Sequence, residues 1–136
     1  MSEEIQKFVF DIEPAATATD ETITIMTVPK GSSVLWVHCF PLVMGAAAFA
    51  DGGITLTIGD AGDADGFVGS INLETAAVDV PVGSAGAYLT VAGGKSYTTA
   101  TAMTATYDYT AGSAPAAAQT VVKPRIRVIV AVANWQ

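Results

Sequence analysis

Apolar and polar residues alternate along most of this chain with the two-residue period of β-strands. Gly- and Pro-containing turns separate the alternating segments, and no stretch has the pattern of an amphipathic helix three turns long. The pattern predicts an all-β fold, an antiparallel β-sandwich or jelly roll of about eight strands. The segments with strand character are residues 5–12, 21–28, 34–44, 54–58, 67–73, 78–82, 87–92, 97–109 and 121–135.

The last of these segments has the clearest core face. Its inward positions are predicted to be Ile126, Val128, Val130 and Val132. In residues 97–109 the corresponding side carries Met103, Ala105, Tyr107 and Tyr109. Because side chains two apart share one face of a strand, both segments are expected to pack against the core.

One strand is predicted to contain an irregularity. Within residues 21–28 the apolar positions move from odd numbers, Ile23 and Ile25, to even numbers, Met26 and Val28. A slip of one residue in the alternation is typical of a β-bulge, which inserts an extra residue into one strand.

Residues 34–44 are apolar on both faces of the predicted strand. This pattern predicts a central strand that is covered on both sides. His38 is therefore expected to be a buried histidine with satisfied hydrogen bonds, and Cys39 to behave as a small apolar residue. Successive strand residues point to opposite faces, so these two do not form a nucleophile–base pair.

The length of 136 residues fits a single domain. No internal repeat or linker divides the chain. We assign residues 21–136 to the sandwich, whereas residues 1–20 form either an N-terminal arm or its first strand.

Charged residues make up 14% of the chain, against about 25% in typical domains. The surface must therefore be rich in small, weakly polar side chains, which favours permanent association with other subunits. The net charge of −7 argues against nucleic acid and against anionic membranes as partners.

Cys39 is the single cysteine, which excludes an intrachain disulfide and a Cys-x-x-Cys metal site. The acidic beginning MSEEIQKF has no apolar segment after it, so we expect no signal peptide. The longest apolar run, residues 34–50, is too short and too interrupted to span a bilayer. These features favour synthesis in a reducing cytoplasm.

Residues 54–73 contain the most acidic loop, in which Asp60, Asp63 and Asp65 alternate with glycines. Clustered carboxylates suggest calcium, but an EF-hand with Asp65 at position 5 would have Ala61 at position 1 and Asn72 at position 12. A looser site at the three aspartates stays open beside the alternative, a solvated Asp/Gly turn. We favour the turn, with no metal and no cofactor.

No nucleophile elbow or phosphate-binding loop is present, and the remaining acids lie in separate loops or strand ends. We therefore expect no enzymatic activity and no catalytic residues. Lys123, Arg125 and Arg127, half of the positive charges, fall on one face of the last segment. They are either a contact stripe for an acidic neighbour or charges that discourage edge-to-edge pairing.

Several phrases resemble a known group of proteins. They are VPKGSSVLWVHCF, ITLTIGDAGDADGFVGSINL, AYLTV, TATYDYTAG and RIRVIVAV. Over residues 20–133 they are similar to small virion structural proteins of tailed bacteriophages, of the head decoration or cement type. Residues 58–68 are the most distinctive part of the match.

The resemblance implies a sandwich or jelly roll without catalytic residues, made in the host cytoplasm and located on the outside of the capsid. There it would cluster as a trimer, clamp subunits of the major capsid protein together and stabilise the head lattice. If residues 1–20 are an arm along neighbouring subunits, Phe8 and Phe10 would be its anchors. Together with Lys123, Arg125 and Arg127 they are the predicted interface residues.

Two other functions remain open. The protein could be a tail- or fibre-associated virion component. It could also be a carbohydrate-binding sandwich that uses exposed aromatic rings as platforms, the candidates being Tyr88, Tyr97, Tyr107, Tyr109 and Trp135.

Overall fold

The computed structural model describes residues 4–14, 21–43, 55–73, 82–90, 94–108 and 124–134. These residues form eight strands and one short 3₁₀ helix, η1. The bounds are β1 Ile5–Ile12, β2 Glu21–Val28, β3 Ser33–Val43, β4 Thr55–Gly59, β5 Val68–Asn72, η1 Ala87–Leu89, β6 Lys95–Ser96, β7 Thr101–Asp108 and β8 Arg125–Ala133. None of the described helices is long and apolar enough to cross a membrane.

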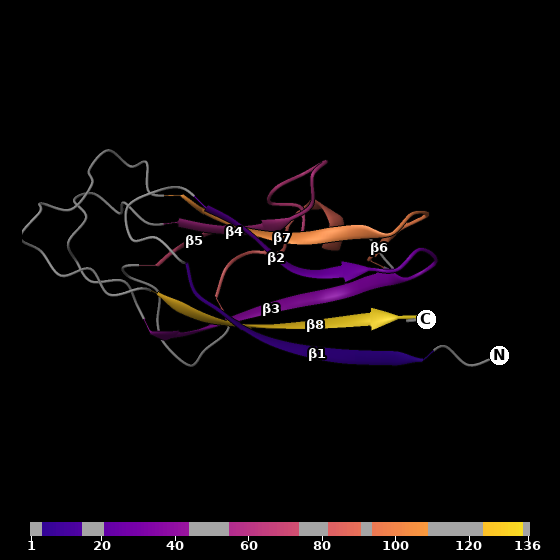
Figure 1. The fold of residues 1–136 in the computed structure, drawn as a ribbon, viewed down its shortest axis with the longest axis horizontal. Coiled ribbons are helices and arrows are strands. Elements are labelled where there is room, and N and C mark those ends of the chain that lie inside the picture. The colour runs from indigo at the N-terminus through magenta and orange to yellow at the C-terminus, as the bar shows by residue number, and fades with distance from the viewer. Residues whose placement is uncertain are drawn as a thin grey trace, which may run out of the picture.

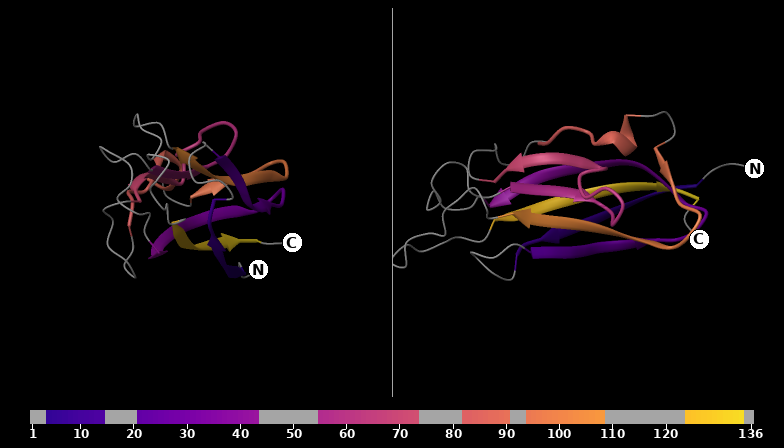
Figure 2. Two further views of the ribbon diagram at one scale, coloured as in Figure 1. Left: turned by 60° about the vertical axis from the view of Figure 1, so that its left-hand side comes forward. Right: turned by 90° about the horizontal axis from the view of Figure 1, so that it is seen from above.

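The strands form two four-stranded antiparallel sheets that stack as a β-sandwich (Figure 1). One sheet has the order β1-β8-β3-β6, which we call the first sheet, and the second has the order β2-β7-β4-β5. The predicted fold class is therefore confirmed. Residues 82–90, including η1, run along one edge of the sandwich (Figure 2).

The core lies between the sheets, and the predicted inward faces of β7 and β8 are confirmed. On β8, Ile126, Val128, Val130 and Val132 are fully buried, and on β7 so are Met103, Ala105 and Tyr107. Tyr109 lies outside the described residues.

The predicted bulge in β2 is also confirmed. The register between β2 and β7 shifts between Thr24 and Met26, where the apolar positions change from odd to even. Ile25 and Met26 are consequently both buried, although they are adjacent in sequence. Because of the extra residue, the odd-numbered apolar side chains before the bulge and the even-numbered ones after it all face the core.

Other predicted strands differ in the structure. Residues 87–89 form η1 instead of a strand, because this turn brings the Tyr88 hydroxyl to Asp60. Lys95 and Ser96, which lie between the predicted strands 87–92 and 97–109, form the two-residue strand β6. From the predicted strand 78–82, only Val82 is among the described residues, and it makes an isolated bridge to Cys39.

The largest difference concerns β3, of which the described residues cover one face and not both. Val34, Val37 and Cys39 point into the core. Trp36 and Phe40 are half-buried on the other side, and His38 is exposed instead of buried. The sequence shows that both faces of β3 are apolar, but the described part of the chain covers one of them.

Candidate assembly surface

The outer faces of the two sheets have opposite chemistry. On the second sheet, threonines dominate the exposed and half-exposed positions, a set that we call the threonine face: Thr22, Thr24, Thr27, Thr55, Thr57, Thr104 and Thr106. On the first sheet several of the corresponding positions carry apolar side chains, a set that we call the apolar outer face: Ile5, Val9, Trp36, Phe40, Leu42 and Ile129. The same side of this sheet also carries polar and charged residues: Lys7, Asp11, His38, Arg125 and Arg127.

Strand register brings the apolar outer face together. Ile129 on β8 lies opposite Val9 on β1 and opposite His38 on β3. Ile5 and Val9 are 57% and 59% exposed. Both lie on β1, and the apolar residues beside them on β8 and β3, Ile129 and Trp36, are half-buried. Apolar side chains that gather on one face make it a candidate interaction surface, whereas single exposed ones do not.

Aromatic contacts order the β3 side of this face. The rings of Trp36 and His38 stack with centroids 4.5 Å apart. The Lys7 ammonium lies 5.7 Å from the centre of the Trp36 ring, within the range of a cation–π contact. Farther along β3, Phe40 and Leu42 line a hollow of about 280 Å³ together with Arg127 and Ile129.

Two residues of the predicted basic stripe, Arg125 and Arg127, lie at the border of this face. Arg127 binds Asp11 through two hydrogen bonds, Nε to Oδ1 at 2.9 Å and Nη2 to Oδ2 at 3.1 Å. The hydrogen bond from Arg127 lowers the pKa of Asp11 from its ordinary value. Arg125 is exposed, and Lys123 lies outside the described residues.

Phe8 and Phe10, the predicted anchors of an arm along neighbouring subunits, lie in a strand of the sandwich itself. Strand β1 pairs with β8 along all eight of its residues, so Ile5–Ile12 is an edge strand of the first sheet. Phe8 and Phe10 are half-buried and pack against the chain's own core. Ile5 and Val9, which the sequence analysis did not single out, point outward instead.

The acidic loop is built around Asp60, which is 6% exposed. Its Oδ2 accepts a hydrogen bond of 2.7 Å from the Tyr97 hydroxyl. Its Oδ1 accepts from the Tyr88 hydroxyl at 2.9 Å and from the backbone N–H groups of Gly62 and Asp63 at 2.9 and 3.0 Å. The Asp60 carboxylate thus links three places in the fold: the loop that follows β4, η1 through Tyr88, and Tyr97, which follows β6.

These contacts also set the ionisation of the cluster. Burial by itself would raise the pKa of Asp60, but the hydrogen bonds from Tyr97, Tyr88 and the two N–H groups outweigh burial and lower it. Burial and the Asp60 carboxylate raise the pKa of Tyr88 to about 12, and they raise that of Tyr97 further. The Lys95 ammonium lies 4.3 Å from the centre of the Tyr88 ring. At neutral pH the cluster therefore consists of one carboxylate and two neutral phenols.

The other two loop aspartates lie at the surface. The hydrogen bond with Asp65 and the negative charge there raise the pKa of Asp63. The described residues contain no group of three or more His, Cys, Asp or Glu side chains placed to hold a metal ion. The carboxylate of Asp60 is oriented toward its two tyrosines, and this gives the loop a structural role.

Glycines allow this loop to pack closely. A Cβ on Gly66 would lie 2.4 Å from the Tyr88 ring, and one on Gly59 would lie 2.0 Å from the Asp63 carbonyl oxygen. The residues that complete the cluster could not be found from periodicity, because Tyr88 and Tyr97 follow Asp60 by 28 and 37 positions.

The remaining candidate residues are placed as follows. Cys39 is buried, which raises its pKa to about 12 and keeps the thiol protonated at neutral pH. Among the proposed sugar platforms, Tyr97 and Tyr107 are buried in the chain's own interior, and Tyr88 is half-buried beside Phe67. Tyr109 and Trp135 lie outside the described residues.

No family model and no curated protein matches this chain. Among solved structures, a chain of the cyanophage Pam1 capsid asymmetric unit is similar, with a TM-score of 0.60 and 19% sequence identity. The alignment covers 96% of the present chain and 84% of the other. At this identity the similarity shows a shared fold.

Proposed function

We propose that this protein is a bacteriophage virion structural protein, a decoration (cement) protein that binds the outside of the head and stabilises it. The observation that carries the proposal is the apolar outer face. Strand β3 has the composition of a doubly covered strand, yet the described chain covers one of its faces. A neighbouring subunit in an assembly would supply the missing cover.

Two further observations support this function. The fold is shared with a chain from a phage capsid asymmetric unit. The phrases in residues 28–40 and 54–73 resemble virion structural proteins, and both contribute strands of this fold.

The mechanism is association without chemistry. A protein that binds the assembled shell and not free capsid subunits shifts the equilibrium toward the shell by mass action. On a lattice, each copy of the protein contacts several subunits. Once one contact has formed, the others form at a high effective concentration, so contacts that are modest one by one stabilise the shell strongly together. Burying side chains such as Val9 and Ile129 contributes about 25 cal/mol per Å² of apolar surface removed from water.

The expected partners are the major capsid protein and other copies of this chain, with a trimer as the expected oligomer. Sedimentation equilibrium of the purified protein measures its mass. A monomer at every concentration used for head binding would remove the trimer from the proposal and leave the apolar outer face as the contact with the shell.

A pair of single variants tests which face binds. Val9→Asp places a charge on the apolar outer face, and Thr24→Asp places the same charge at an exposed strand position on the threonine face. We expect Val9→Asp to weaken binding to heads that lack the protein by at least about tenfold, because a carboxylate in place of an aliphatic side chain would lose its hydration at the contact. Thr24→Asp is expected to bind within about twofold of the unmodified protein.

Equal binding by the two variants would contradict the assignment of this face. If the unmodified protein does not bind heads but binds tails or fibres, the decoration function is wrong and the tail-associated alternative replaces it.

A further inference from the structure

Among the described residues, the β3 edge of the first sheet, the side of β3 that faces away from β8, has a gap in its pairing. Strand β6 pairs with β3 at Ser33 and Val34. Farther along, Val82 pairs with Cys39 through an isolated bridge. Between these two points, no described residue pairs with residues 35–38 on the side of β3 that faces away from β8.

The backbone of Val37 points into this gap. The Cys39 carbonyl accepts the Val82 N–H at 2.9 Å, so the backbone polar groups of Cys39 face away from β8. In an antiparallel ladder this orientation alternates, and Val37 therefore presents its N–H and C=O in the same direction. No described residue bonds to them there. Buried backbone groups are nearly always paired, so the N–H and C=O of Val37 call for a partner outside the described residues.

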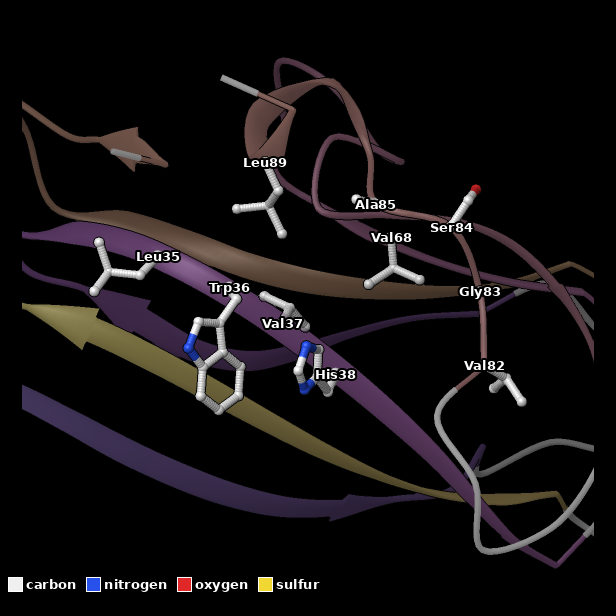
Figure 3. A pocket seen from close by; sticks show the side chains of 10 residues that line it. All are labelled: Leu35, Trp36, Val37, His38, Val68, Val82, Gly83, Ser84, Ala85 and Leu89. Atoms are coloured by element: carbon white, nitrogen blue, oxygen red, sulfur yellow. The ribbon is translucent and has the colours of Figure 1, made fainter. Parts of the chain in front are cut away.

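A cavity of about 320 Å³ opens at the same place (Figure 3). Leu89 and Val68 point toward β3 from one side, and Trp36 and His38 lie side by side on β3. Its other lining residues are Leu35, Val37, Val82, Gly83, Ser84 and Ala85. None of the lining residues is Asp, Glu, Lys or Arg, and most of the lining side chains are apolar, so the cavity favours an uncharged side chain.

Residues 82–86 hold the far wall in place. Val82 is bonded to β3, whereas the Ser84 carbonyl accepts the Gly69 N–H at 2.8 Å and Gly86 donates to the Phe67 carbonyl at 3.0 Å. This segment therefore crosses from one sheet to the other. Gly83 has φ +86°, and a Cβ there would lie 2.7 Å from Val68, so the crossing is tightly packed.

We propose that the β3 edge at residues 35–38 accepts an extended segment of a neighbouring capsid subunit as an added strand. The segment lies between β6 and Val82, bonds to the backbone of Val37 and places one uncharged aliphatic side chain in the cavity. At about 3.3 Å per residue, four or five residues fill the gap. Strand addition of this kind takes affinity from main-chain hydrogen bonds and specificity from the side-chain pocket.

This inference rests on the proposed function, because the partner comes from the virion. The gap is continuous with the apolar outer face: Trp36 and His38 line the cavity and also stand on that face. A capsid subunit that covers the apolar outer face would therefore have its chain next to the β3 edge.

Hydrogen–deuterium exchange of the Val37 amide is the direct test. In the free protein we expect this N–H to exchange rapidly, while the Val130 N–H in the core of the same sheet is protected. On the head, the Val37 amide is expected to become protected by at least about tenfold. Protection already present in the free protein would mean that another part of this chain fills the gap and would overturn the proposal.

A pair of variants tests the cavity. Ala85→Phe places a ring at the cavity, and Ala87→Phe adds the same ring at an exposed position that does not line it. We expect Ala85→Phe to weaken head binding at least about tenfold, the equivalent of one aliphatic anchor, and Ala87→Phe to bind within about twofold of the unmodified protein. Melting curves of both variants check that the fold is retained.

The outcomes separate this inference from the proposed function. If the unmodified protein does not bind heads, the decoration function fails and the inference fails with it. If it binds, but the Val37 amide stays unprotected and the two alanine variants bind equally, the strand addition is wrong while decoration stands.

Discussion

Asp60 shows how a single buried carboxylate can hold a loop in place. Four hydrogen bonds converge on its two oxygens, two from tyrosine hydroxyls and two from the backbone of its own loop. Hydrogen bonds to a charged group contribute about 1.5–3 kcal/mol each, more than neutral ones. The loop is therefore a stabilising joint between strands that are distant in sequence.

Removing the Tyr97 hydroxyl should weaken this joint. We expect Tyr97→Phe to lower the free energy of unfolding by about 1.5–3 kcal/mol, since it leaves Oδ2 of a buried carboxylate without the donor that it has in the structure. Tyr88→Phe should lower it less, because Tyr88 is more exposed and Oδ1 keeps two backbone donors. Urea unfolding measures both, and a Tyr97→Phe variant as stable as the unmodified protein would contradict the account.

The lowered pKa of Asp60 predicts a loss of stability in acid. A carboxyl whose pKa is lower in the folded state contributes stability above its ordinary value of 3.8, and the contribution is lost as the pH falls through the folded value. The raised pKa of Asp63 has the opposite sign, so protonation there relieves repulsion from Asp65.

We expect Asp60→Asn to be less stable than the unmodified protein at pH 7 and to lose less stability between pH 5 and 2. Melting curves across this range measure the difference. Asp11→Asn is the control at an exposed ion pair, where the change should be small. Parallel pH profiles for the Asp60→Asn variant and the unmodified protein would refute the role of this carboxylate.

The aspartate loop is also expected not to respond to calcium. Asp60 is engaged with tyrosine and backbone donors, and Asp63 and Asp65 lie at the surface. Calorimetric titration with calcium should give no heat, and added calcium should leave the melting temperature unchanged. A binding isotherm that disappears in Asp63→Asn would show that the looser metal site exists.

At the scale of elements, periodicity predicted those features that depend on neighbouring residues along one strand. The core face of β8 and the bulge in β2 are examples, since both follow from which positions are apolar. It did not predict η1, whose Tyr88 is held by Asp60 from a loop 28 positions earlier. For β3 the periodicity indicated that both faces are apolar, but the pattern of apolar residues does not say what covers each face.

The close approach between Gly66 and Tyr88 gives a prediction at this scale. Gly66→Ala should lower the free energy of unfolding by about 1–3 kcal/mol, because the added methyl would overlap the ring at 2.4 Å. Gly62→Ala in the same loop is the matched control, since its Cβ would lie 3.3 Å from its nearest neighbour, Oδ1 of Asp60. Equal melting temperatures for the two variants would show that η1 is not packed on the loop as described.

The whole molecule is a sandwich with two unlike outer faces. The threonine face can remain in water, whereas the apolar outer face brings Val9, Ile129 and Trp36 together across three strands. The low charge content predicted association, but the face that we propose for it could not be read from the sequence. It depends on strand order, which places β8, from one end of the chain, between β1, from the other end, and β3.

The proposed decoration function is tested most directly by an icosahedral cryo-EM reconstruction of the phage head to which we propose that this protein binds. We predict density for the sandwich on the outside of the lattice, with β1, β8 and β3 against the major capsid protein and the threonine face toward solvent. A head lattice without this chain, or one in which the threonine face meets the shell, would contradict the account.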